Sequence, residues 1–251
     1  MNIKFSSVID FSEDAWPGKT ASVVYLAGCP LQCYWCNVPF LVNVQEGSYD
    51  SKPTDFFVSH FSKLQASVEG IVFLGGEPFM QGNALNGLCK QLKAMGFALR
   101  TETSGFYPQD LRDLLPYLDY VALDVKAPLD EDSYATAASF TGDKRILLSK
   151  ILSSLAFLEA DKRVFKEIRT TVIPGLNDSV DAIEKICSQS SFADLYALQQ
   201  FKPGGKGDFV NADYECGEPA PKEKMYELAY AAKKTFKEVL VRFNDGSEEL
   251  I

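Results

Sequence analysis

The stretch CPLQCYWC at positions 29–36 places Cys29, Cys33 and Cys36 on one short segment. Three thiolates on a short loop can hold three corners of a cubic iron–sulfur cluster and leave the fourth iron without a protein ligand. Such a cluster ordinarily takes four cysteine thiolates, and a structural zinc site also closes with four ligands. The spacing therefore predicts a metal centre that stays open to another molecule.

Zinc is the main alternative metal. It would need a fourth ligand, which His60 or Cys216 could supply only through a fold that the sequence does not reveal. His60 falls in an expected helix, where it is more simply a partly buried helix residue. Cys89 and Cys187 also fall in expected helices and are expected to be small buried hydrophobic residues.

The composition narrows the class of protein. The chain has 251 residues, of which 46% are hydrophobic and 24% charged, as in soluble globular domains. The net charge of −9 argues against general binding to a phosphate backbone. No apolar run approaches the roughly 20 residues of a membrane span, and residues 1–19 lack the apolar core of a secretory signal. We therefore expect a cytoplasmic protein with neither a membrane nor a nucleic acid as partner.

After an irregular start, β-rich runs alternate with amphipathic stretches. Apolar runs such as 23–26 and 71–74 are typical of strands buried on both faces. The expected strands span Ser22–Ala27, Gly70–Leu74, Phe97–Thr101, Tyr120–Asp124, Lys166–Val172, Leu195–Phe201 and Glu238–Arg242, and the expected helices Thr54–Ser67, Ala84–Ala94, Pro108–Leu115, Lys144–Leu158, Val180–Ser188 and Pro221–Thr235.

The alternation predicts an α/β fold with a parallel sheet and right-handed crossovers. Length and repeat number favour a partial (β/α)6 TIM-like barrel, although periodicity alone does not separate it from an open doubly wound sheet. Two long irregular segments, Asn37–Pro53 and Pro203–Pro219, each follow an expected strand. Since ligands gather at the carboxyl ends of parallel strands, both segments are candidate walls of a site.

The segment FLGGEP at positions 73–78 ends the second expected strand. Gly75 and Gly76 have no side chains, so backbone amides and carbonyls can approach a ligand closely there. Glu77 can accept hydrogen bonds from an ammonium group. An ordinary strand-to-helix turn would explain the two glycines equally well.

Together, the cysteine loop and this later segment resemble the radical S-adenosylmethionine (SAM) enzymes. Further segments at strand ends match as well, namely 101–105, 123–126, 169–175 and 198–203. They resemble the glycyl-radical-enzyme activating proteins, and most closely the anaerobic ribonucleoside-triphosphate reductase activating protein. The resemblance runs from about residue 18 to residue 205. It implies one radical SAM domain over residues 1–251, with a C-terminal extension at 206–251.

The resemblance implies two cofactors and their contacts. Cys29, Cys33 and Cys36 would hold one [4Fe-4S] cluster and act in catalysis, with SAM on the free iron. Trp35 would lie next to the SAM adenine. The segment with Gly75, Gly76 and Glu77 would hold the SAM amino group. The remaining cofactor contacts implied are Asp124 and Lys126 near the SAM carboxylate and sugar, Arg169 at the SAM end of its strand, and Glu102 and Thr103 at a small monovalent cation site.

The implied reaction is reductive cleavage of SAM to a 5′-deoxyadenosyl radical, which abstracts hydrogen from a glycine of a partner glycyl radical enzyme of the anaerobic ribonucleotide reductase type. A reductant such as flavodoxin or ferredoxin would supply the electron. The sequence departs from the pyruvate formate-lyase activase pattern at Lys202, where that pattern has histidine. Segment 37–53 has no cysteine, so a single cluster is expected.

Two alternatives remain open. A radical SAM enzyme of this size could act on a small molecule or a different peptide, as the carboxy-deazaguanine synthases do. A more remote alternative is a non-catalytic iron–sulfur or zinc protein.

Overall fold

The computed structural model describes residues 1–33, 35–36, 38–45, 47–203, 210 and 217–251. Within them the strands form one sheet in the order β10-β9-β8-β7-β6-β5-β4-β2-β1-β3. Its parallel strands are β2 (Ala21–Leu26), β4 (Gly70–Gly75), β5 (Ala98–Thr103), β6 (Tyr120–Asp124), β7 (Phe165–Val172), β8 (Leu195–Gln200) and β9 (Val239–Arg242).

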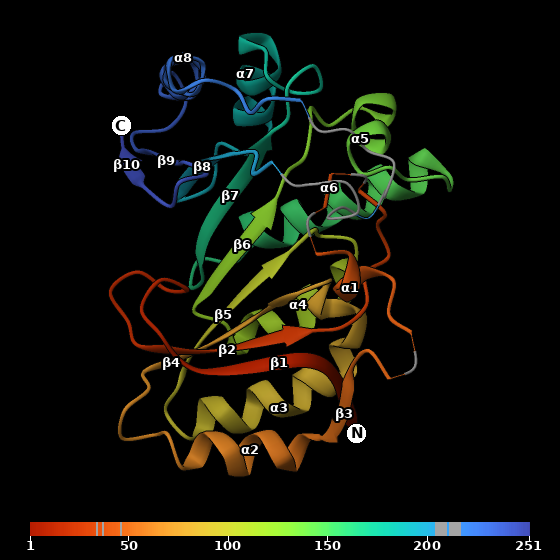
Figure 1. The fold of residues 1–251 in the computed structure, drawn as a ribbon, viewed down its shortest axis with the longest axis vertical. Helices are drawn as coiled ribbons and strands as arrows, with labels where there is room; N and C mark the ends of the chain where they lie inside the picture. Colours follow the sequence, from red (N-terminus) through yellow and green to blue (C-terminus); the bar gives the residue numbers. More distant parts are fainter. Residues whose placement is uncertain (34, 37, 46, 204–209, 211–216) are drawn as a thin grey trace.

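The parallel strands lie side by side in the order of the chain. A doubly wound sheet would reverse the order of its parallel strands at a switch point, and the parallel strands here show no reversal. Its two edges, β3 (Asp50–Pro53) and β10 (Glu248–Leu250), do not pair with each other, so the barrel stays open. In Figure 1 the strands fan out from β1 and β2 to the steep β7, as in a strongly twisted sheet. The expected partial barrel is confirmed.

The helices connect successive strands. The longer ones are α2 (Thr54–Ser62), α3 (Gly82–Ala94), α6 (Lys144–Ala160), α7 (Val180–Gln189) and α8 (Lys222–Ala232), and the short ones are α1 (Pro39–Val42), η1 (Pro78–Gln81), α4 (Pro108–Leu114), η2 (Leu115–Tyr117) and α5 (Glu131–Ala137). Every expected strand and helix is present: Tyr120–Asp124 has the expected bounds, and the others are shifted at one or both ends, by most at the end of α2, which is Ser62. No helix in the described part of the chain is long and apolar enough to cross a bilayer.

The sequence reasoning missed three strands, namely β1, β3 and β10. The start of the chain, expected to be irregular, forms β1 (Asn2–Ser12), which pairs antiparallel with β2 and with β3. Segment Asn37–Pro53 contains α1 and β3 rather than only irregular structure. β3 and β10 are exposed at every residue, and β1 alternates exposed residues with buried or half-buried ones, so none of the three carries the continuous apolar run that marks the buried parallel strands.

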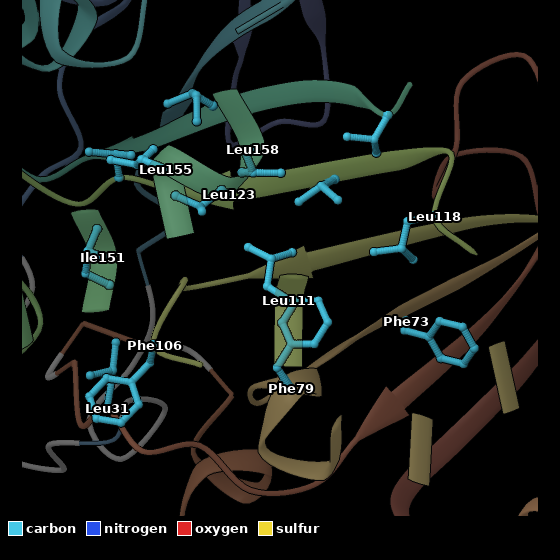
Figure 2. Packing of buried hydrophobic residues seen from close by; sticks show 14 of the residues in the cluster. Leu31, Phe73, Phe79, Phe106, Leu111, Leu118, Leu123, Ile151, Leu155 and Leu158 are labelled. Atoms are coloured by element: carbon cyan, nitrogen blue, oxygen red, sulfur yellow. The ribbon is translucent and has the colours of Figure 1, made fainter. Parts of the chain in front are cut away.

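The two faces of the sheet differ in chemistry. One face packs against the helices in a large apolar core, and Figure 2 shows Leu123 of β6, Leu111 of α4 and Leu158 of α6 among its members. On the opposite face, Trp16 and Val72 belong to a small apolar cluster near the strand starts. Beyond this small cluster, the same face carries charged side chains towards the carboxyl ends of the strands, and these form the candidate site.

Candidate active site

A cavity of about 340 Å³ is formed by the cysteine loop and the carboxyl ends of β4 to β8. This is where parallel α/β folds place their ligands. The site residues predicted from the sequence line it, with the exception of Glu77: they are Cys29, Cys33, Trp35, Cys36, Gly75, Gly76, Glu102, Thr103, Asp124, Lys126 and Arg169. Residues that are far apart in the chain therefore meet in one cavity.

The cysteine loop is fixed where the chain segments that follow the parallel neighbours β2 and β4 come close together. Gly28 precedes Cys29 with a φ of 99° and donates from its backbone N–H to the Leu41 carbonyl at 2.7 Å. The Glu77 backbone N–H donates in turn to the Gly28 carbonyl at 2.7 Å. A Cβ built at Gly76 would lie 2.2 Å from the Gly28 oxygen. Only glycine allows this close approach of Gly76 to Gly28, which positions the loop against the end of β4.

The cysteines are thiols that need a metal to become thiolates. Burial, with a smaller contribution from Glu77, raises the pKa of Cys29 to about 12, and burial raises that of Cys33 to about 11. Burial also raises the pKa of Cys36. Bound iron must therefore displace three protons.

The donor set fits a cluster better than a single ion. The sulfur-bearing side chains border one common cavity. Among the described residues, no group of three or more His, Cys, Asp or Glu side chains is arranged to hold one metal ion. His60 is paired instead with Asp10 at 2.7 Å, on α2 and β1. His60 is thus engaged elsewhere and does not serve as the fourth zinc ligand, and Cys216, the other candidate, lies outside the described residues.

Trp35 is held in a defined orientation. Its indole N–H donates to the Ala137 carbonyl at 3.0 Å, and the Lys126 ammonium lies 5.4 Å from the ring centroid. Phe201 packs nearby in a small apolar cluster with Ile173. The ring thus forms an oriented wall of the cavity.

Arg169 is the centre of the charged wall. Its Nε donates to Asp124 at 2.9 Å and its Nη1 lies 2.8 Å from a Glu102 oxygen. Lys126 lies 3.8 Å from the second Asp124 oxygen. Although burial alone would raise it, Arg169 and Lys126 hold the pKa of Asp124 below its usual value. The positive charges of Arg169 and Lys126 are therefore nearly balanced by the negative charges of Asp124 and Glu102.

Further ion pairs extend from this wall towards β9. Arg100 lies 3.3 Å from Glu102 and 3.5 Å from Glu167, and Glu167 also pairs with Arg242 of β9. Positive and negative groups thus alternate from the cavity to the C-terminal strands. Because two guanidinium groups already contact Glu102, the structure gives no support to the small cation expected beside it.

The structure places the Glu77 carboxylate away from the cavity. The side chain is fully buried and accepts hydrogen bonds from Thr103 Oγ1 at 2.8 Å, from Ser104 N and Oγ at 2.8 and 2.5 Å, and from Phe79 N at 3.1 Å. Its oxygens are thereby occupied by protein donors. The expected contact with an ammonium group has no geometric support.

Other lining residues were not predicted as site residues. They are Leu31, Val38, Val42, Ser104, Thr171, Gln199, Gln200, Phe201 and Lys202. Several of them belong to the strand-end segments 101–105, 169–175 and 198–203, so the position of a residue at the carboxyl end of a parallel strand was the signal available. Cys89 and Cys187 are buried in helices, as expected. Cys216 lies outside the described residues.

Comparison with known proteins decides the family. The model of the radical SAM superfamily matches residues 23–186. The chain belongs to the radical SAM superfamily. Membership implies a [4Fe-4S] cluster and SAM as cofactors, and the open three-cysteine loop fits them.

Relatives of the superfamily agree with this assignment. A protein named “Putative glycyl-radical enzyme activating enzyme” from Methanocaldococcus jannaschii is 31% identical over 254 residues, 100% of each chain. A 7-carboxy-7-deazaguanine synthase from Thermococcus kodakarensis is 29% identical over 189 residues, 63% of this chain and 71% of that protein. The structure of a radical SAM methyltransferase from Sphaerobacter thermophilus matches with a TM-score of 0.65 at 17% identity, over 91% of this chain and 67% of that one. This last likeness concerns the fold alone.

Proposed function

We propose that this radical SAM protein activates a glycyl radical enzyme of the anaerobic ribonucleotide reductase type, by hydrogen abstraction from a glycine of that partner. The observation that carries the proposal is the meeting of the three-cysteine loop with the Asp124–Arg169–Glu102 wall in one cavity. When bound, the cluster and SAM would supply a 5′-deoxyadenosyl radical after one-electron reduction. The protein itself would bind and orient the two cofactors and shield the reaction from water.

Each group in the cavity has a separate task in this proposal. Cys29, Cys33 and Cys36 would hold the cluster, and the bare backbone at Gly75 and Gly76 would approach the SAM amino group. Lys126 and Arg169 carry the positive charge suited to the SAM carboxylate, and Asp124 can accept hydrogen bonds from sugar hydroxyls. Trp35 offers a ring face to the adenine. Thr103 lies at the edge of the same cavity.

The full-length relative supports the glycine-directed reaction, since its name describes an activating enzyme. We further propose a cytoplasmic protein that receives electrons from a flavodoxin or ferredoxin. We treat residues 1–251 as one radical SAM domain, because β9 of the 206–251 extension is paired with β8 of the core.

A second candidate function is a radical reaction on a small molecule. The likeness to a 7-carboxy-7-deazaguanine synthase favours it. The two candidates differ in the product: an activated partner carries a stable glycyl radical, whereas a small-molecule enzyme releases a modified compound.

The experiment is an anaerobic incubation of the reduced, reconstituted protein with SAM and a candidate glycyl radical enzyme, followed by electron paramagnetic resonance. A glycyl signal in the partner is the expected result, and Cys33→Ala should abolish both that signal and methionine release. Retained methionine release in Cys33→Ala would refute the proposal. Methionine release without any glycyl radical would favour the small-molecule function.

A further inference from the structure

A second cavity, of about 310 Å³, adjoins the candidate active site. It lies between the end of β8 and the hairpin of β9 and β10, and it shares Gln199, Gln200 and Lys202 with the first cavity. The first cavity is at the small end of the range for ligand pockets. With SAM bound there, little room is left for a second molecule, so the adjoining cavity is the natural place for the substrate.

The junction between the cavities is firmly built. The Gln200 amide donates to the Ala220 carbonyl at 2.7 Å, and its oxygen accepts from the Asn244 backbone N–H at 2.9 Å. Phe201 is buried against Ile173. These contacts hold Gln200 and Phe201, the two residues that precede Lys202.

Lys202 differs from the other cations around the two cavities. Arg169 and Lys126 are paired with Asp124, and Arg242 of the second cavity is paired with Glu167 and Glu248. Within the described ranges Lys202 has neither an ion pair nor a hydrogen bond, and its side chain is exposed. Its charge is therefore free to meet a ligand.

We propose that Lys202 binds a carboxylate of the substrate at the junction of the two cavities. The inference rests on the proposed function, since it names a feature of the substrate of that site. The carboxylate can belong to an acidic side chain beside the target glycine of a protein, or to a carboxylated small molecule. In both cases the Lys202 ammonium would pair with a carboxylate group.

The test compares matched ligands on the reconstituted full-length protein with SAM present. One pair is two labelled peptides with a central glycine flanked by Asp or by Asn, followed by fluorescence anisotropy. The other pair is 7-carboxy-7-deazaguanine and uncharged 7-deazaguanine, followed by calorimetry. The variants are Lys202→Gln, Lys202→Arg and, as a matched loss of charge on the exposed side of α3, Lys90→Gln.

In one of the pairs the wild-type protein should bind the carboxylate ligand about fivefold more tightly than its neutral partner, as expected of a partly exposed ion pair. Lys202→Gln should remove this preference, whereas Lys202→Arg and Lys90→Gln should keep it. The pair that responds identifies the source of the carboxylate.

Absence of a carboxylate preference in both pairs, or a preference that survives in Lys202→Gln, would overturn the inference. A tenfold loss of SAM affinity in Lys202→Gln would overturn it too, because Lys202 would then belong to the SAM site. All three outcomes leave the proposed function intact. That function fails separately if the reduced wild-type protein releases no methionine from SAM.

Discussion

The Glu77 carboxylate accepts two hydrogen bonds from Ser104, one from the backbone N–H at 2.8 Å and one from the hydroxyl at 2.5 Å. This contact joins the turn after β4 to the end of β5. Since Ser104 and Gly76 both line the cavity, Glu77 acts on the site through the backbone that it holds.

Glu77→Gln should lower the free energy of unfolding of the metal-free protein by about 2 kcal/mol. The amide nitrogen of glutamine cannot accept hydrogen bonds, so buried donors of Ser104 or Thr103 lose their partner. Chemical denaturation measures the change, and the exposed Glu69→Gln is the control. If metal-free stability were unaffected while SAM affinity fell, Glu77 would contact the cofactor instead.

Gly76→Ala should destabilise the protein by about 3 kcal/mol or more, because the new methyl group would overlap the Gly28 carbonyl. Gly87 in α3 is the matched control, since a Cβ there meets no atom within 4 Å. Gly87→Ala should be stabilising by about 0.5–1 kcal/mol. Thermal unfolding of the two variants checks the difference, and equal effects would contradict the close approach of Gly76 to the Gly28 carbonyl.

Asp124→Asn should lower the free energy of unfolding at neutral pH. Burial works to raise the pKa of Asp124, but Arg169 and Lys126 outweigh it and lower that pKa in the folded state. The ionised carboxylate therefore contributes stability that is complete above its ordinary pKa and is lost as the pH falls through the lowered one. The difference between wild type and variant should shrink below about pH 4. A difference independent of pH would show that the ion pairs contribute no stability.

Much of this site could be predicted because its signals are local. The cysteine spacing and the polar residues that end successive strands are readable in the sequence, and parallel pairing brings those ends together. The role of Glu77 could not be read, since its partners Thr103 and Ser104 come from the next strand. Lys202 could not be assigned to a second cavity either, because that cavity depends on the β9–β10 hairpin.

The exposed strands β1 and β3 were missed for a related reason. β3 is exposed at every residue and β1 alternates exposed residues with buried or half-buried ones, so neither sequence carries a continuous apolar run. The pairing of Glu102 with Arg169 likewise joins β5 to β7, which are separated by β6 in the sheet. Contacts of this kind follow from the fold and not from spacing.

The most direct test of the open iron is electron paramagnetic resonance of the anaerobically purified, reduced protein before and after addition of SAM. We predict a [4Fe-4S]⁺ signal whose g values shift when SAM binds, and no such cluster in Cys33→Ala. A protein without iron and sulfide, or a cluster signal that SAM leaves unchanged, would contradict the account.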